Sequence, residues 1–292
     1  MTGATRRFAP DVHRDAMLLL GLLVGLAYAA GLFATPVDAV NYWGAGPSLM
    51  LYPPSWSEVG EGFLFYPPPV AQISALLQPV GWAVFIVVLM VTIFGSFWYC
   101  CREWSLPLVA AAIPFYLGVG PDWPATFLSY ALIGNLQWVL AAVSILAIRH
   151  PALWAFLFFT KVTTAVGWLW HVARGEYGAA AMGAFASAVV LAISFVASPD
   201  MWAAFISFAV RNAALQDSPI PMFPVPYVVR VPMSAALIVW GGRTDRAWTV
   251  PAGVGWALPA MYGLGFLPFW MAALRMARSP TPLGGDSSAH PA

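Results

Sequence analysis

The hydrophobic residues of this chain are gathered into long runs that are separated by more polar segments. The runs cover residues 16–35, 80–99, 105–120, 126–148, 151–173, 177–197, 226–240 and 247–274. A helix that crosses a membrane needs about 20 predominantly apolar residues. Because a helix pairs its own backbone polar groups, each run is predicted to be helical. In the first run, the spacing of Gly21 and Gly25 could let another helix approach closely, although ordinary helix glycines would look the same.

Two of the runs do not fit a single crossing. Residues 151–173 carry Lys161 in the middle, and residues 247–274 are long and interrupted by Pro259. Each run could cross once, or enter the membrane and return. If both return and the N-terminus is cytoplasmic, ten of the thirteen Lys and Arg residues face the cytoplasm: Arg6, Arg7, Arg14, Arg102, Arg149, Arg174, Arg243, Arg246, Arg275 and Arg278. Since cytoplasmic loops carry an excess of basic residues, this distribution favours two hairpins.

The same topology places two long loops, residues 36–79 and 198–225, on the outer face. Within them, Val70–Leu77 is predicted to be a short helix, and Met201–Leu215 an amphipathic helix on the membrane surface. Residues 1–278 are predicted to form one polytopic domain with about 8–10 membrane-embedded helices, some short or re-entrant. The Pro-, Gly- and Ser-rich tail, residues 279–292, is predicted to be disordered.

The composition points to the same class of protein. The 292 residues are 61% hydrophobic and 9% charged, with a mean hydropathy of +0.76, whereas a soluble domain is about 25% charged. We therefore predict an all-α, polytopic integral membrane protein of the plasma membrane. The net charge of +1 gives no basis for a nucleic-acid partner. Cys100 and Cys101 are adjacent and are interpreted as structural residues.

Asp38 is the first ionisable residue after the first apolar run, and it follows the Thr35-Pro36 break. If the segment after Pro36 is helical, Asp38 and Tyr42 share a face, and Trp43 is the next residue. The carboxylate would then lie at the outer membrane boundary beside aromatic rings that could stack on a sugar. Alternatively, Asp38 caps a surface helix through the N–H groups of its first turn.

Lys161 is the only lysine in the chain. A charge in the centre of a membrane segment costs at least about 2.5–3.5 kcal/mol, so it requires a partner or a polar cavity. The hydroxyl groups of Thr160, Thr163 and Thr164 could help Lys161 to bind an anion. The alternative is a structural ion pair with a carboxylate or contacts with backbone carbonyls.

Other polar residues lie near the predicted outer face. Arg230 could contact a phosphate through its guanidinium fork or serve as a snorkelling anchor, and Arg211 is a weaker candidate of the same kind. Asn135 and Gln137, in the segment GNLQW, could hydrogen-bond a ligand or join helices.

Several chemistry-bearing motifs are absent from the sequence. There is no Gly-rich phosphate loop with Lys-Ser/Thr, so ATP-driven work is not expected. There is also no Asp-x-Asp pair, no His/Cys cluster and no Gly-x-Ser-x-Gly motif. We therefore predict neither a metal site nor a cofactor.

Five segments occur in a characteristic order: DAVNYW, FLFYPPPVAQISALLQPVGWAVF, GNLQWVL, FFTKVTTAVGWLWHVARGEY and GGRTDRAWTVPAGVGWALPAMYG. Over about residues 30–275 they resemble the bacterial membrane glycosyltransferases of family 87, which have the GT-C fold. The stretches around Lys-Val-Thr and Trp-Thr-Val-Pro are the most specific. Thr164 and Ala165 stand where the family often has Pro and Gly.

The resemblance implies a GT-C-like helical bundle that moves a hexose, commonly mannose, from a polyprenyl phosphate to a glycan or glycolipid acceptor on the outer face. It implies that Asp38 is the general base. Lys161, Arg230 and the weaker candidate Arg211 would then bind the donor phosphate. The residues expected to bind substrates are Tyr42, Trp43, Tyr66, Asn135, Gln137, Thr163, Glu58 and Glu61.

Two other functions remain open at the level of sequence. A carrier or flippase for a lipid-linked sugar would also use buried cations. A non-catalytic membrane subunit could retain the same fold without any transfer activity. Replacement of Asp38 by Asn separates both from a transferase, because only a transferase needs this carboxylate for turnover.

Overall fold

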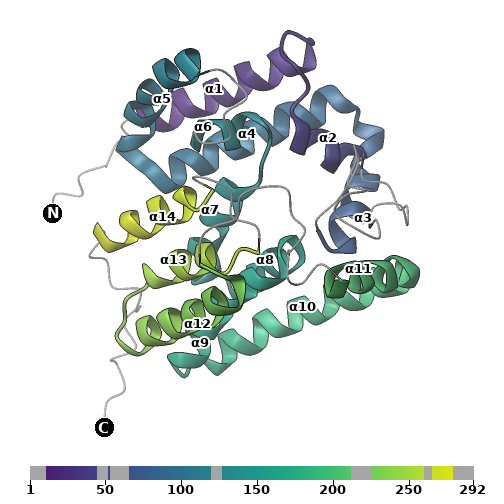
Figure 1. Ribbon diagram of the computed structural model, residues 1–292, viewed down its shortest axis with the longest axis vertical. Helices are drawn as coiled ribbons and strands as arrows, with labels where there is room; N and C mark the ends of the chain where they lie inside the picture. Colours follow the sequence, from purple (N-terminus) through teal and green to yellow (C-terminus); the bar gives the residue numbers. More distant parts are fainter. Residues whose placement is uncertain are drawn as a thin grey trace, which may run out of the picture.

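The long apolar stretches of the sequence are helices in the computed structural model of the protein (Figure 1). The structure describes residues 11–44, 52, 66–119, 127–211, 225–259 and 265–278, with only the backbone of residues 114–119 and 127. Every regular element within these ranges is helical: α1 (Val12–Ala29), α2 (Val37–Gly44), α3 (Pro68–Leu77), α4 (Trp82–Cys101), α5 (Ser105–Val119), α6 (Phe127–Leu132), α7 (Gln137–Ala147), α8 (Trp154–Thr160), α9 (Leu169–Ala173), α10 (Tyr177–Ala197), α11 (Pro199–Arg211), α12 (Tyr227–Arg243), α13 (Thr249–Trp256) and α14 (Leu267–Arg278). The all-α prediction is confirmed for this part of the chain. The tail at residues 279–292 lies outside the described residues.

The surface of the long helices is apolar, as a membrane protein requires. The described residues contain three helical segments long and apolar enough to cross a membrane: Val12–Ala29, Trp82–Ile113 and Tyr177–Ala197. On α10, Phe185, Ile193 and Val196 expose 67%, 67% and 82% of their surface. Water would make such an exposed apolar face unfavourable, whereas lipid does not. These features indicate an integral membrane protein, while the count of about 8–10 embedded helices stays a prediction.

α1 packs closely along α4 because two glycines of α1 lack side chains. A Cβ atom on Gly21 would lie 2.9 Å from the carbonyl oxygen of Met90, and one on Gly25 would lie 2.7 Å from the Cα atom of Val87. Both distances are too short for a methyl group. Gly21 and Gly25 therefore form a small-residue contact between helices, which was one of the two alternatives left open by the sequence.

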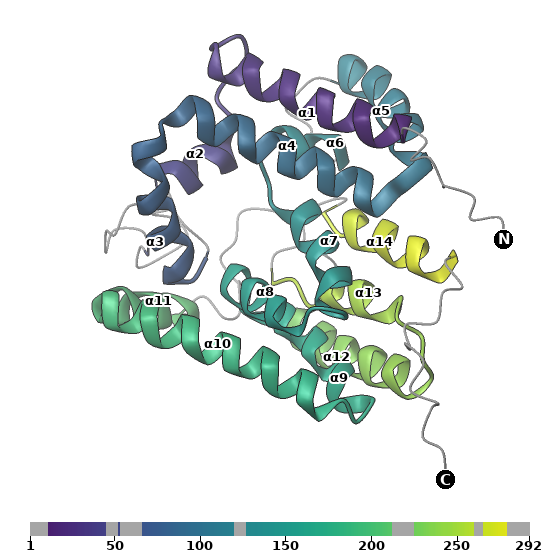
Figure 2. The same cartoon turned by 180° about the vertical axis from the view of Figure 1, so that it is seen from behind.

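α7 is the centre of the core. Nearly all of its residues are buried, and it contacts α4, α8, α13 and α14. In Figures 1 and 2, α1, α4 and α5 lie on one side of α7, and α8 to α13 lie on the other. The sequence predicted one run at residues 126–148, and this prediction is wrong: the chain breaks between α6 and α7, where Gly134 has a φ of 82°. That conformation is open to glycine and strained for most other residues.

Residues 151–173 turn back on themselves at Lys161. α8 ends there, and Lys161 has an extended backbone (φ −147°, ψ 105°). The 3₁₀ segment η6 (Val162–Trp168) and α9 then lead the chain back, so that the ring of His171 lies 6.4 Å from the ring of Trp154 near the start of the hairpin. This is the hairpin that the distribution of basic residues favours.

Residues 247–274 also return. α13 begins against the last turns of α12, where a Cβ atom on Gly241 would collide with Thr249. α14 packs back against α13 and α4, and the guanidinium of Arg275 donates to the carbonyl oxygen of Tyr99 near the end of α4. In Figure 1 the ends of α4, α12 and α14 point to the same side, which makes this run a second hairpin.

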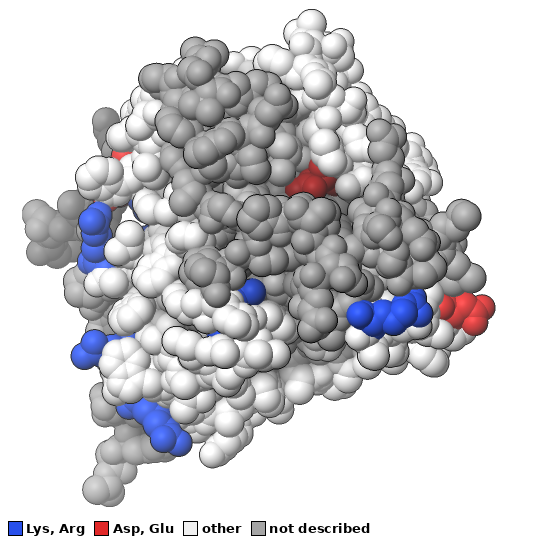
Figure 3. Space-filling view, viewed as in Figure 1, with Lys and Arg blue, Asp and Glu red and all other residues white. Residues whose placement is uncertain are grey.

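The two hairpins bring most of the described basic residues to one end of the helices. α1 and α10 begin at this end, and α4, α9, α12 and α14 finish there, opposite α2, α3 and α11 (Figure 1). Figure 3 shows basic side chains along the corresponding edge of the molecule. The basic residues within or next to these helix ends are Arg14, Arg102, Arg174, Arg243, Arg246, Arg275 and Arg278. Which membrane face this end occupies stays a prediction.

Candidate active site

Asp38 lies in the first turn of α2, as the sequence predicted, but it is not needed as a cap. The N–H groups of Asp38 and Ala39 donate to the carbonyl oxygen of Ile133, at 3.1 and 3.4 Å. A Cβ atom on Gly134 would lie 2.8 Å from the Cβ atom of Ala39, so only glycine permits this approach. The α6–α7 turn therefore caps α2 and leaves the carboxylate of Asp38 available for other contacts.

Asn135 orients the carboxylate of Asp38. Its side-chain Nδ2 donates to Oδ2 of Asp38 at 2.7 Å. Its Oδ1 accepts from the backbone N–H of Gln137 at 2.9 Å. Because the amide of Asn135 is fixed at both ends, it holds one carboxylate oxygen in place and leaves the second oxygen of Asp38 outside this hydrogen bond.

Two buried tyrosines, Tyr42 and Tyr66, lie near Asp38, and Tyr66 also contacts Lys161. The hydroxyl groups of Tyr42 and Tyr66 are 2.9 Å apart, and their rings meet edge to face at 5.4 Å. Tyr52 donates its hydroxyl hydrogen to the carbonyl oxygen of Tyr66 at 2.9 Å, which fixes the residue that precedes α3. The ammonium nitrogen of Lys161 lies 5.7 Å from the centroid of the Tyr66 ring, within the range of a cation–π contact.

The charges of Asp38 and Lys161 influence one another. Partial burial raises the pKa of the Asp38 carboxyl above its ordinary value, while the Asn135 hydrogen bond and the positive charge of Lys161 oppose this rise. Burial, followed by the charge of Asp38, also raises the pKa of Tyr66, so this hydroxyl stays protonated at neutral pH. The site thus combines a carboxylate of increased basicity with a nearby cation and protonated phenols.

The turn at Lys161 is held by a hydroxyl group. Thr164 Oγ1 lies 2.7 Å from the carbonyl oxygens of both Leu157 and Lys161, so its hydrogen is shared between them. Both carbonyl oxygens also accept a backbone N–H, that of Lys161 for Leu157 and that of Thr164 for Lys161, so the hydroxyl is an additional donor at the end of α8. Thr164 therefore stabilises the reversal that presents Lys161 to the site.

The sequence suggested that Arg230 contacts a phosphate or is a snorkelling anchor, and in the structure it contacts backbone carbonyls. Its guanidinium is buried and donates to four backbone carbonyls, those of Val225 (3.0 Å), Trp256 (3.0 Å), Leu258 (2.8 Å) and Pro259 (3.2 Å). It thereby ties the start of α12 to the end of α13. A phosphate at Arg230 would have to compete with these carbonyls.

The other predicted substrate residues are spread more widely. The Trp43 ring packs against Trp82 and Phe85 of α4, with centroids 6.1 and 5.1 Å away. Gln137 is buried, and its Oε1 has no partner among the described residues. Thr163 lies beside Tyr227.

Two further expectations concern the outer loops. Arg211 is exposed on α11 and donates to Ser207 Oγ at 2.6 Å, so its described contact is local. Glu58 and Glu61 lie outside the described residues.

Tyr52 and Tyr227 were not predicted to contribute to the site. For Tyr52 a signal was present, because Tyr52 and Tyr66 are both followed by consecutive prolines.

The fold and site together define an all-helical integral membrane protein with a carboxylate–amide pair facing a lysine. In the described ranges, no group of three or more His, Cys, Asp or Glu side chains could hold a metal ion. Comparison with protein-family models, curated proteins and solved structures finds no match to the chain.

Proposed function

We propose that the protein is a membrane glycosyltransferase of the GT-C type. It transfers a hexose, mannose-like, from a polyprenyl phosphate to a hydroxyl group of a glycan or glycolipid acceptor, with the active site on the outer face and the N-terminus in the cytoplasm. The observation that carries this proposal is the shared location of Asp38, Asn135 and Lys161. The resemblance to family 87 supports the same assignment.

In this reaction Asp38 acts as the general base. Its carboxylate takes the proton of the acceptor hydroxyl as the oxygen attacks the anomeric carbon of the donor sugar. Asn135 holds the carboxylate in the orientation that the proton transfer needs. The raised pKa of Asp38 makes its carboxylate a stronger base than that of an exposed aspartate.

The leaving group explains why one carboxylate is sufficient. Inverting glycosidases use a second carboxyl group as an acid to protonate the leaving oxygen. Here the bond from the anomeric carbon to the phosphate oxygen breaks, and the electron pair stays on a stable polyprenyl phosphate anion. The ammonium of Lys161 would stabilise the negative charge that develops on that phosphate.

The position of Lys161 suits a donor that is a lipid. Lys161 is at the tip of a hairpin, seven residues after the first residue of α8, so it lies about 10 Å along the helix axis from the start of α8 at 1.5 Å per residue. A polyprenyl phosphate could bring its head group to this depth while its chain stays among the helices. We infer that Lys161 and Tyr66 bind the phosphate of the donor. Tyr42 and Asn135 lie on the side of the site that binds the sugar.

The decisive experiment uses purified full-length protein and a panel of radiolabelled polyprenyl-phosphate sugars. We expect Asp38→Asn to lower transfer by about 10²–10⁴-fold, the usual contribution of general base catalysis, and to leave donor binding within about twofold. Asp200→Asn is the matched control, because Asp200 is exposed on α11, on the same predicted side, and its loss is expected to leave transfer unchanged.

Two outcomes would overturn the proposal. If Asp38→Asn transfers sugar at the wild-type rate, Asp38 is not the base. If the wild-type protein transfers no sugar from any donor but moves a lipid-linked sugar across vesicle membranes, and Asp38→Asn does so equally well, the protein is a carrier.

A further inference from the structure

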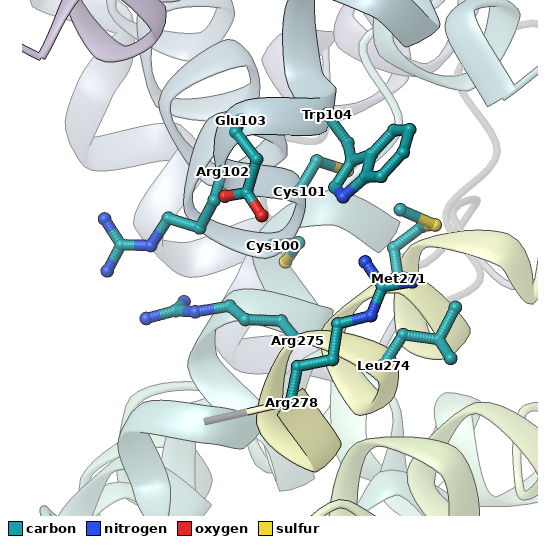
Figure 4. A pocket seen from close by; sticks show the side chains of 9 residues that line it. All are labelled: Cys100, Cys101, Arg102, Glu103, Trp104, Met271, Leu274, Arg275 and Arg278. Carbon is teal, nitrogen blue, oxygen red and sulfur yellow. The ribbon is translucent and has the colours of Figure 1, made fainter. Parts of the chain in front are cut away.

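A pocket of about 450 Å³ lies near the end of α4 that is opposite α2 and α3 (Figure 4). Trp43 of α2 packs against the start of α4, whereas the pocket contains Cys100 and Cys101 from its end. The 20 residues of α4 separate the two places by about 30 Å at 1.5 Å per residue. The pocket is therefore remote from Asp38, and a ligand bound there would be independent of the proposed glycosyltransferase activity.

Three arginines from two segments converge on this pocket. Arg102 belongs to the short η4 segment (Arg102–Trp104) between α4 and α5, and Arg275 and Arg278 belong to the last turns of α14. In Figure 4 the side chains of Arg102 and Arg275 extend to the same side, and that of Arg278 extends toward Trp104 and Met271. Glu103 is the only carboxylate among the lining residues, so the lining is strongly positive overall.

The guanidinium groups of Arg102 and Arg275 lie on the same aromatic ring. Their central carbons are 5.2 and 3.9 Å from the centroid of Tyr99, and Arg102 is also 4.5 Å from the ring of Trp98. Two like charges held this close together repel each other, and an anion between them would relieve the repulsion. A stacked guanidinium can still bind a phosphate or carboxylate at its edge, because the N–H groups lie in its plane.

The backbone at the pocket is strained. Arg102 has a φ of 52°, a conformation that residues with a Cβ atom rarely adopt. Such strain costs free energy and persists mainly where the surrounding structure requires it, commonly at functional sites. At Arg102 the unusual conformation ends α4 and directs an arginine into the pocket.

The rim of the pocket is apolar. Trp104 and Leu274 are each 47% exposed, and the guanidinium of Arg278 lies 5.7 Å from the Trp104 ring. Indole rings and arginines are typical of the boundary between lipid tails and head groups. A small soluble anion would use the arginines but gain nothing from this rim, whereas a lipid would contact both.

We propose that this pocket binds the phosphate head group of an anionic membrane lipid. The three guanidinium groups contact the phosphate oxygens, and the acyl chains lie along Trp104 and Leu274. Basic pockets between helices at the membrane boundary suit acidic head groups for this reason. The bound lipid would connect the α4–α5 turn to α14.

The test uses full-length protein in nanodiscs of phosphatidylcholine with or without one fifth cardiolipin, followed by mass spectrometry of the lipid that stays bound after detergent extraction. We expect the wild type to retain cardiolipin. Arg102→Gln with Arg278→Gln is expected to lower its retention by about 25-fold, at about fivefold for each arginine. The matched control is Arg243→Gln with Arg246→Gln, which removes the same charge at exposed positions outside the pocket and is expected to change retention by less than about twofold.

The outcomes are distinguishable even if one variant folds poorly. Arg278→Gln alone changes an exposed side chain and is expected to lower retention by about fivefold. Equal retention by the pocket variants and the control pair would overturn the proposal. If soluble glycerol 3-phosphate binds the wild type as tightly as cardiolipin does, the ligand is a free phosphate ester and the assignment to a lipid is wrong.

Discussion

Replacement of Asn135 by Ala tests whether the amide sets the charge state of Asp38. The variant loses the 2.7 Å hydrogen bond from Nδ2 of Asn135 to Oδ2 of Asp38. A hydrogen bond to an ionised group contributes about 1.5–3 kcal/mol, and one unit of pKa corresponds to about 1.4 kcal/mol. Because this bond favours the ionised carboxylate, its loss is expected to raise the pKa of Asp38 by about one to two units.

The first assay is the pH dependence of kcat/KM for sugar transfer. A general base works only when ionised, so the rate falls as the pH drops below the pKa of Asp38. Burial already raises that pKa above its ordinary value. In Asn135→Ala the acid limb of the profile is therefore expected to move to higher pH by about one to two units.

A second assay does not depend on activity. Because the pKa of Asp38 is raised in the folded protein, the stability from this group is greatest below the pKa of the unfolded carboxyl and falls as the pH rises through the folded pKa. Removing the Asn135 amide raises the folded pKa further. The loss of thermal stability in Asn135→Ala is thus expected to be larger at pH 7 than at pH values where Asp38 is protonated in both states.

Gln78→Ala is the matched control for Asn135→Ala. Gln78 also donates a side-chain amide hydrogen to the α2 region, to the carbonyl oxygen of Trp43 at 3.3 Å, but that acceptor is neutral and lies at the other end of α2. Its loss should leave the acid limb in place. An acid limb that stays fixed, or moves to lower pH, in Asn135→Ala would refute the reasoning.

Three further predictions concern other parts of the molecule. Lys161→Met is expected to weaken binding of a polyprenyl phosphate by at least about tenfold, because a charged hydrogen-bond donor to the phosphate is lost; unchanged binding in a filter or calorimetric assay would contradict its role. Gly25→Ala is expected to destabilise the protein by about 1–3 kcal/mol, since its Cβ atom would lie 2.7 Å from the α4 backbone. Gly178→Ala in α10 meets open space and should be neutral or stabilising by up to about 1 kcal/mol; thermal unfolding of both variants in detergent provides the comparison. A cysteine at Thr35 should react with a membrane-impermeant maleimide in intact cells and one at Tyr177 only after permeabilisation, and labelling of both from the same side would disprove the proposed topology.

The sequence by itself determined where the helices form. The apolar run at residues 177–197 became α10 with the same bounds, and Val70–Leu77 lies within α3. Transfer of apolar side chains out of water depends mainly on the local composition, so these elements can be predicted one segment at a time. The break between α6 and α7 at Gly134 could not be predicted from one segment. The positive φ of Gly134 serves a contact with Ala39, which is remote in sequence.

Residue types and their positions in the sequence also single out Asp38, Tyr42, Tyr66 and Lys161. A lone lysine inside an apolar run is costly and indicates a functional site, and Asp38 is the first ionisable residue after the first apolar run. Their partners could not be predicted in the same way. The hydrogen bond of Asn135 to Asp38 joins residues 97 positions apart.

Only the tertiary structure decided what each charged side chain contacts. From the sequence Arg230 could be a phosphate contact or a snorkelling anchor, and the fold surrounds it with the carbonyl groups that end α13. Arg102 and Arg275 are far apart in the sequence and lie on one tyrosine ring in the fold. The physical reason is range: hydrophobicity acts on each segment separately, whereas hydrogen bonds and ion contacts act over a few ångströms and depend on how distant segments pack.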